Sequence, residues 1–144
     1  MAVAESCTGG LLATRIVDTP GSGEWFKGGL VAYDAAVKFR LLNVPEGPVI
    51  TDQAAMAMAR GARDLLEAGI GVAVTGVAGP DPEEGIPVGT VFLGISDEEG
   101  ERAVELQLRG SPREIREAAA ARALTEILTR REEASSRGAA KSPS

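Results

Sequence analysis

The feature that most constrains the fold of this chain is a short, uninterrupted apolar run, Ile70–Val74, set between an alanine-rich stretch and a glycine-rich turn. A continuous apolar strand is typical of a sheet covered on both faces, because a strand with one face in water alternates polar and apolar residues. The stretch before it, 51–68, predicts a helix with Thr51 or Asp52 as its cap and Gly69 as its end. A sheet between two layers of helices is therefore the expected architecture.

The rest of the chain also alternates between strand-like and helix-like segments. Further strands are predicted at 1–4, 30–33, 91–95 and 103–108, and further helices at about 8–18, 35–42 and 112–131. A hairpin turn at Asp97–Gly100 makes the last two strands antiparallel, and Ser111-Pro112-Arg113-Glu114 starts the last helix as a capping box. We therefore predict an α/β fold, a three-layer α/β/α sandwich with a mixed, mostly parallel sheet, in one domain of residues 1–131. Residues 132–144 are small, polar and charged, and we expect them to form a disordered tail.

The chain contains no histidine, and Cys7 is its single cysteine. A Ser-His-Asp triad, a Cys-His pair, a histidine-ligated metal and a cysteine cluster that holds zinc are therefore all excluded. Any acyl-transfer chemistry needs a lysine, a carboxylate, a tyrosine or an N-terminal amine as its base. We expect neither a metal nor a cofactor.

Charge and hydropathy narrow the range of partners. Fifteen Lys and Arg against 21 Asp and Glu give a formal net charge of −6, which disfavours nonspecific binding to nucleic acid. No apolar run reaches the ~18–20 residues that span a bilayer, and the first residues lack the basic and apolar regions of a secretory signal. We therefore expect a cytoplasmic protein that binds neither nucleic acid nor membrane.

Ser6, Thr8, Gly9 and Gly10 form the first candidate site, where the first strand meets the first helix. Backbone N–H groups at such a turn stabilise a phosphate or a developing oxyanion, and glycines let a ligand approach the backbone closely. The alternative is that Ser6 or Thr8 only caps the helix.

The turn Thr75-Gly76-Val77-Ala78-Gly79-Pro80 forms the second candidate site. It follows the most buried strand, so it lies at the carboxyl edge of the sheet, where open α/β folds bind ligands. The turn is neither a Walker loop nor a dinucleotide fingerprint. A tight structural turn explains it equally well.

Tyr33 and Lys38 form the third candidate, at a strand end and in the following short helix. Lysine acts as a general base only if its pKa falls from about 10.4 by roughly 3 units, through burial or nearby positive charge. A solvated charge is the alternative.

Arg116, in the first turns of the last helix, is the fourth candidate, since arginine is the natural partner of a phosphate or carboxylate. Arg113 competes for that role, and a surface salt bridge on the same helix is the alternative.

Four blocks of the chain, taken together, resemble the CinA C-terminal domain family in their order and spacing. They read AESCTGGL at 4–11, VAY at 31–33 with Lys38, TGVAGP at 75–80 and PVGTV at 87–91. Members of this family are nicotinamide-nucleotide amidohydrolases, also called NMN deamidases, of pyridine-nucleotide salvage. The resemblance extends to about Leu128. It implies a three-layer α/β/α sandwich that hydrolyses nicotinamide mononucleotide to nicotinate mononucleotide and ammonia.

The resemblance also implies roles for the matching positions. Ser6 would be the nucleophile, Lys38 the base that takes its proton, and Tyr33 a helper in the proton relay or in orienting the amide. Thr75 and the neighbouring backbone would contact the substrate or the oxyanion, and Arg116 would bind the phosphate or position the site. The substrate-binding positions implied are Thr8, Gly9, Gly10, Thr75, Gly76, Gly79 and Arg116. A serine with a lysine base follows the logic of Ser-Lys amidases.

The chain departs from the family pattern in three places. The family usually has a helix and a full first strand before the first block, so the first helix and part of the first strand are expected to be missing. Ala35 replaces a common asparagine, and 45–51 is shorter than usual. One alternative is a non-catalytic nucleotide-binding or competence-associated module. Another is the detached half of a two-domain CinA protein with an upstream pyrophosphatase domain. We expect a homodimer, because a partner could cover the sheet edge left by a short first strand.

Overall fold

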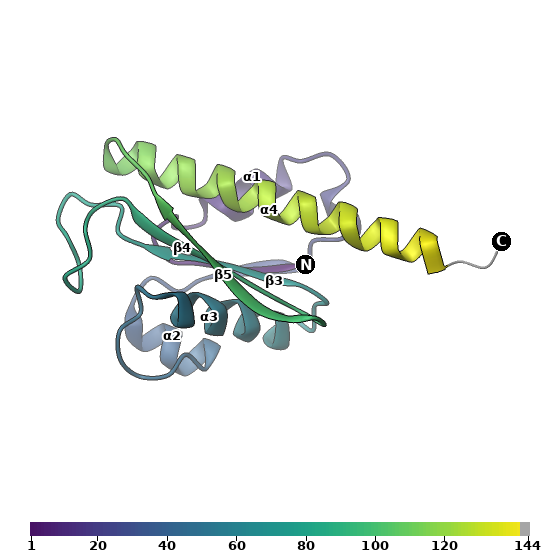
Figure 1. Cartoon of the computed structure of the whole chain (residues 1–144), viewed down its shortest axis with the longest axis horizontal. Helices are drawn as coiled ribbons and strands as arrows, with labels where there is room; N and C mark the ends of the chain where they lie inside the picture. Colours follow the sequence, from purple (N-terminus) through teal and green to yellow (C-terminus); the bar gives the residue numbers. More distant parts are fainter. Residues whose placement is uncertain (142–144) are drawn as a thin grey trace.

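The computed structural model describes the backbone of residues 1–141 and the side chains of residues 1–138. Its strands are β1 (Ala2–Glu5), β2 (Gly28–Val31), β3 (Gly71–Gly76), β4 (Thr90–Asp97) and β5 (Gly100–Gln107). Its helices are α1 (Leu11–Val17), the 3₁₀ turn η1 (Ser22–Glu24), α2 (Ala35–Leu42), α3 (Asp52–Leu65) and α4 (Pro112–Lys141). Helices α1 and α4 cover one face of the sheet and α2 and α3 the other (Figure 1), so the predicted three-layer α/β/α sandwich is confirmed.

The five strands form one mixed sheet in the order β2-β1-β3-β4-β5. Strand β1 pairs in parallel with β2 and β3, while β4 is antiparallel to both β3 and β5. Four strands therefore run in one direction and β4 runs against them, which is the mostly parallel mixed sheet expected from the sequence. Strand β1 lies inside the sheet, so the edges that a partner copy could cover belong to β2 and β5 and not to the first strand.

The two faces of the sheet carry side chains of different size. Val3, Val72 and Val74 pack under α1 and α4, whereas Ala2 and other small residues face the alanine-rich helix α3. Gly94 in β4 shows how closely α3 approaches, because a methyl group there would overlap backbone atoms of that helix. Close helix–sheet packing explains why 51–68 is so rich in alanine.

The predicted element boundaries needed small corrections. Helix α2 has the predicted bounds, and Thr51 caps α3 by accepting a hydrogen bond from the Ala54 amide at 2.9 Å. Helix α3 ends at Leu65, before the predicted stop at Gly69, because Glu67 adopts a left-handed conformation with φ 51°. Strand β2 lies two residues earlier than predicted.

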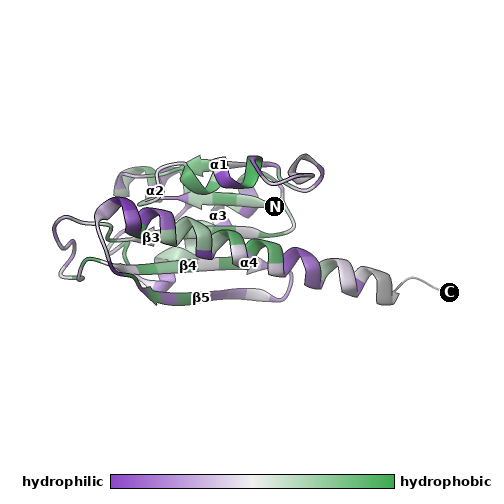
Figure 2. Cartoon of the chain, turned by 90° about the horizontal axis from the view of Figure 1, so that it is seen from above, coloured by the Kyte–Doolittle hydropathy of each residue, from purple (hydrophilic) through white to green (hydrophobic). Residues whose placement is uncertain are grey.

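Helix α4 is the largest correction. We expected the helix to end near Arg131, but it continues to Lys141, so the predicted disordered tail is wrong for 132–141; residues 142–144 lie outside the described residues. Arg130 pairs with Glu126 and Glu133 along the helix, and Arg137 pairs with Glu99 at the β4–β5 turn at 3.0 Å. Polar, charged composition is typical of both disorder and an exposed helix, and here the ion pairs favour the helix. In Figure 2, α4 projects beyond the sheet, and the coloured part of this projection is largely hydrophilic.

No helix within residues 1–141 is long and apolar enough to span a membrane.

Candidate active site

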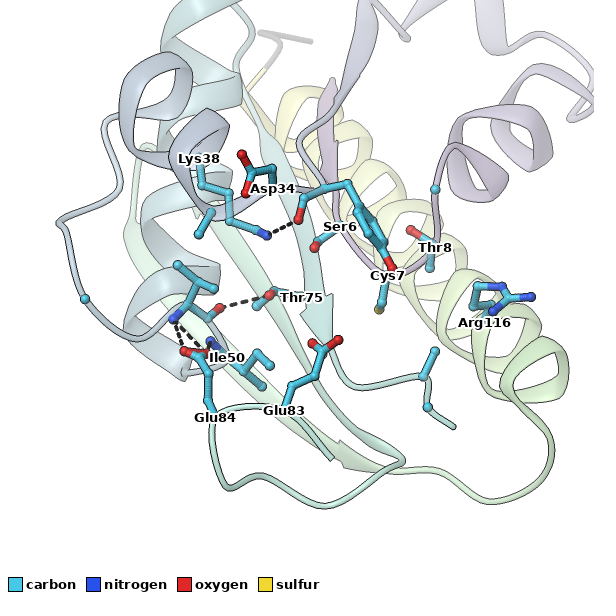
Figure 3. Close-up of a pocket in the computed structure, with 18 residues that line it drawn as sticks. Ser6, Cys7, Thr8, Asp34, Lys38, Ile50, Thr75, Glu83, Glu84 and Arg116 are labelled. Atoms are coloured by element: carbon cyan, nitrogen blue, oxygen red, sulfur yellow. Dashed lines mark hydrogen bonds between the residues drawn. The ribbon is translucent and has the colours of Figure 1, made fainter. Parts of the chain in front are cut away.

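The candidate residues meet at one edge of the sheet, because the carboxyl ends of the parallel strands β1, β2 and β3 lie together there. A cavity of about 700 Å³ opens at this edge (Figure 3). Its lining includes Ser6, Thr8, Gly9, Tyr33, Lys38, Thr75, Gly76, Gly79 and Arg116. The structure thus brings together every candidate except Gly10, which lines a second cavity of about 610 Å³ beside Arg113 and Arg116.

Glu5 organises the turn that carries Ser6. Its buried carboxylate accepts hydrogen bonds from the Thr8 hydroxyl at 2.6 Å, the Leu12 amide at 2.8 Å and the Ala13 amide at 3.0 Å. These bonds compensate the cost of burying a charge. The start of α1 is therefore occupied by a side chain of the protein itself, and neither Ser6 nor Thr8 caps the helix as the structural alternative supposed.

Ser6 differs from the two threonines in the cavity wall by its hydrogen bonding. A hydroxyl has one proton to donate. The Thr8 hydroxyl donates its hydrogen bond to the Glu5 carboxylate, and the Thr75 hydroxyl donates to the Val49 carbonyl at 2.9 Å. The Ser6 hydroxyl makes no hydrogen bond within the described part of the chain, although Ser6 is only 6% exposed. In this wall, Ser6 is the serine or threonine whose proton remains free to transfer.

Lys38 is 2% exposed, so the alternative of a solvated helix charge is wrong. Its Nζ donates to the Tyr33 carbonyl oxygen at 3.0 Å. Burial lowers the pKa of Lys38, while the negative charges of Asp34, Glu83 and Glu84 oppose that shift. A lysine in this setting can lose its proton more readily than one in water.

Tyr33 holds Lys38 through its backbone and not through its phenol. It lies two residues beyond the end of β2, and its side chain is 71% exposed at the cavity.

Cys7, which the sequence analysis did not select, also lines the cavity. Burial raises the pKa of the Cys7 thiol to about 11, so this thiol stays protonated near neutral pH and is a poor nucleophile.

The opposite wall of the cavity is held by hydrogen bonds to the segment 49–50. Thr75 donates to the Val49 carbonyl, and the Glu84 carboxylate accepts from the Val49 amide at 2.9 Å and the Ile50 amide at 2.8 Å. Packing explains the glycine at position 76, since a methyl group there would overlap the backbone at Thr90 and Val91. The turn at 75–80 is thus both a packed turn and part of the cavity.

The two candidate arginines have different surroundings. Arg113 is exposed and pairs with Glu117 at 3.2 Å, as the salt-bridge alternative supposed. Arg116 lines both cavities and makes no ion pair within the described residues. Arg116 is therefore the guanidinium available to an anion at this end of the site.

Asp34, Glu83 and Glu84 line the cavity as well, and sequence reasoning missed all three. Glu83 and Glu84 lie in a surface loop whose sequence gives no periodic signal. Asp34 precedes a helix, where an aspartate is usually interpreted as a cap, yet its side chain makes no capping hydrogen bond.

Comparison with known proteins gives a consistent result. The chain matches the CinA C-terminal domain model over residues 1–130. It is 44% identical over 129 residues to a CinA-like protein of Frankia casuarinae, covering 86% of this chain and 30% of that protein. It is also 44% identical over 135 residues to a CinA-like protein of Gemmatimonas aurantiaca, covering 88% and 31%. The chain thus spans less than a third of the length of these relatives.

Solved structures agree with the fold. A competence-damaged protein (CinA) superfamily protein from Enterobacter cloacae has a TM-score of 0.84 at 27% identity, covering 90% of this chain and 80% of that one. The competence/damage inducible protein CihA from Agrobacterium tumefaciens has a TM-score of 0.82 at 33% identity, covering 89% and 82%.

Proposed function

The chain belongs to the CinA C-terminal domain family, and on that premise we propose that it is an amidohydrolase that converts nicotinamide mononucleotide to nicotinate mononucleotide and ammonia. The observation that carries this proposal is the uncommitted Ser6 hydroxyl in a cavity shared with the buried Lys38. A serine and a lysine of lowered pKa together meet the requirements of an activated nucleophile.

The reaction proceeds in two steps. The Ser6 oxygen attacks the carboxamide carbon while neutral Lys38 takes the hydroxyl proton. The Thr8 amide, which makes no backbone hydrogen bond in the described chain, is a donor available to the developing oxyanion. Lys38 then gives its proton to the amide nitrogen, the C–N bond breaks, and ammonia leaves. The acyl group remains on the Ser6 oxygen as an ester. Water hydrolyses the ester, releasing the carboxylate and restoring the serine.

The other residues position the substrate and the base. The Tyr33 carbonyl fixes the Lys38 amine by accepting a hydrogen bond from it, which leaves the nitrogen lone pair of the neutral amine for Ser6. Because the Thr75 hydroxyl already donates its hydrogen bond to the Val49 carbonyl, its oxygen can accept a hydrogen bond from the substrate amide but cannot donate one to the oxyanion. Arg116 binds the phosphate at the far end of the cavity.

The test is ammonia release from nicotinamide mononucleotide by the purified chain. Ser6→Ala and Lys38→Met should each lower kcat by at least about a thousandfold, as expected for members of one catalytic unit. Lys27→Met is the matched control, since Lys27 is exposed and outside the cavity lining.

Full activity of Ser6→Ala would remove the nucleophile from the proposal. Nucleotide binding by the folded wild-type chain with no ammonia release would instead support the non-catalytic binding module.

A further inference from the structure

Two carboxylates in the cavity wall have no role in the chemistry described above. Asp34 and Glu83 make no side-chain hydrogen bond or ion pair within the described residues, whereas Glu84 is fully engaged with the 49–50 backbone. Figure 3 shows the Glu83 carboxylate reaching into the cavity from the loop opposite Lys38. The hydroxyl of the buried Ser6, which also has no hydrogen-bond partner among the residues that the structure describes, faces the same space.

These carboxylates work against the catalytic base. Both raise the pKa of Lys38, and Glu83 also raises the pKa of Cys7, so their charge reaches the reacting centre. A negative charge beside a lysine that must be neutral is unfavourable for general-base catalysis. Their position therefore indicates a benefit in binding, which a positively charged part of a ligand would supply.

The cavity is also polarised from one side to the other. Asp34 lies beside Lys38 and Glu83 reaches toward them from the facing loop, whereas Arg116 projects from α4 at the other end of the cavity (Figure 3). Such an arrangement is complementary to a ligand with a cation close to the bond that reacts and an anion at its far end. An oxidised nicotinamide nucleotide has this charge pattern, since its ring nitrogen is positively charged and lies meta to the carboxamide.

We propose that Glu83, assisted by Asp34, recognises the positive charge of the pyridinium ring, so that the site selects oxidised nicotinamide nucleotides over their neutral dihydro forms. This inference rests on the proposed function and adds the residue that sets its substrate class. Glu83 acts on the part of the ring that does not react, so it is a specificity-determining residue and not a member of the proton relay.

The experiment compares two ligands that differ in ring charge. Oxidised and reduced nicotinamide mononucleotide carry the same carboxamide, ribose and phosphate, but only the oxidised form has a cationic ring. Calorimetry gives the Kd of each for the Ser6→Ala protein, in which turnover is blocked. Glu83→Gln is added to this background, and Asp81→Asn is the matched control because Asp81 is an exposed carboxylate of the same loop outside the cavity lining.

Glu83→Gln should raise the Kd of the oxidised nucleotide about 3- to 10-fold, the range for a partly solvated charge pair. The Kd of the reduced nucleotide should stay within about twofold, and Asp81→Asn should change neither value. Adding Asp34→Asn should weaken binding of the oxidised form further. Thermal melts of each variant verify that the fold is intact.

An equal loss for both nucleotides in Glu83→Gln, or no loss for either, would overturn the recognition of ring charge. Ammonia release by the wild-type chain together with an unchanged oxidised-to-reduced ratio in Glu83→Gln would reject this inference and leave the proposed function standing. Failure of Ser6→Ala and of the wild-type chain to bind either nucleotide would reject both.

Discussion

Replacing Glu5 with glutamine should weaken the hydrogen bonds that hold the turn carrying Ser6, without changing any residue that lines the cavity. The carboxylate of Glu5 is 1% exposed and accepts three hydrogen bonds, from the Thr8 hydroxyl and the Leu12 and Ala13 amides. A glutamine can keep its oxygen at the position that serves Thr8 and Leu12. Its NH₂ group must then face the Ala13 amide, which sets one donor against another.

The size of the effect follows from that geometry. A hydrogen bond to a charged group contributes about 1.5–3 kcal/mol, and a buried donor without an acceptor costs about 1–3 kcal/mol. Since two of the three bonds can survive, Glu5→Gln should lower the free energy of unfolding by about 2–4 kcal/mol. At about 2–4 °C per kcal/mol for a domain near this size, Tm should fall by about 4–16 °C.

Calorimetric melting of the purified variants measures this change. Glu98→Gln is the matched control, because Glu98 lies in the exposed β4–β5 turn and should shift Tm by less than about 2 °C. Ammonia release should also fall in Glu5→Gln, since Ser6 directly follows the altered residue. A Glu5→Gln protein that melts within about 2 °C of the wild type would refute the view that this carboxylate holds the start of α1.

Two further predictions concern the base and the phosphate. The value of kcat/KM should rise with pH as Lys38 loses its proton, and the midpoint of this rise should lie below the ordinary lysine pKa of about 10.4, because burial favours the neutral amine. Glu83→Gln should move the midpoint to lower pH, because it removes a negative charge that raises the Lys38 pKa. A midpoint at or above about 10.4 would contradict the burial argument. Arg116→Gln should raise KM for nicotinamide mononucleotide about 10-fold or more, whereas Arg113→Gln should leave it within about twofold, since Arg113 is exposed and paired with Glu117. Steady-state kinetics with both variants decides between the two arginines.

Much of the fold could be predicted because its signals are local. The apolar run at 70–74 indicated a strand covered on both faces, and β3 is buried throughout. The capping box at the start of α4 forms as expected: the Glu114 carboxylate accepts from the Ser111 amide, and the Ser111 hydroxyl accepts from the Glu114 amide. The end of α4 could not be predicted from composition, because the pair between Arg137 and Glu99 joins residues far apart in the sequence.

For the candidate site too, the features with local sequence signals could be predicted, and those that depend on contacts between distant residues could not. Glycine-rich turns and strand ends identified residues such as Ser6 and Thr75, since the carboxyl ends of parallel strands must meet. The hydrogen bonding of those residues depends on partners that sequence spacing does not reveal. The Thr8 hydroxyl donates to the Glu5 carboxylate, and the Thr75 hydroxyl donates to the Val49 carbonyl. The hydrogen-bond partners in the folded protein, and not the mere presence of a hydroxyl, distinguish Ser6 from Thr8 and Thr75. The same reasoning applies to charge, because Glu83 reaches the cavity through a loop whose path is set by contacts with the 49–50 segment.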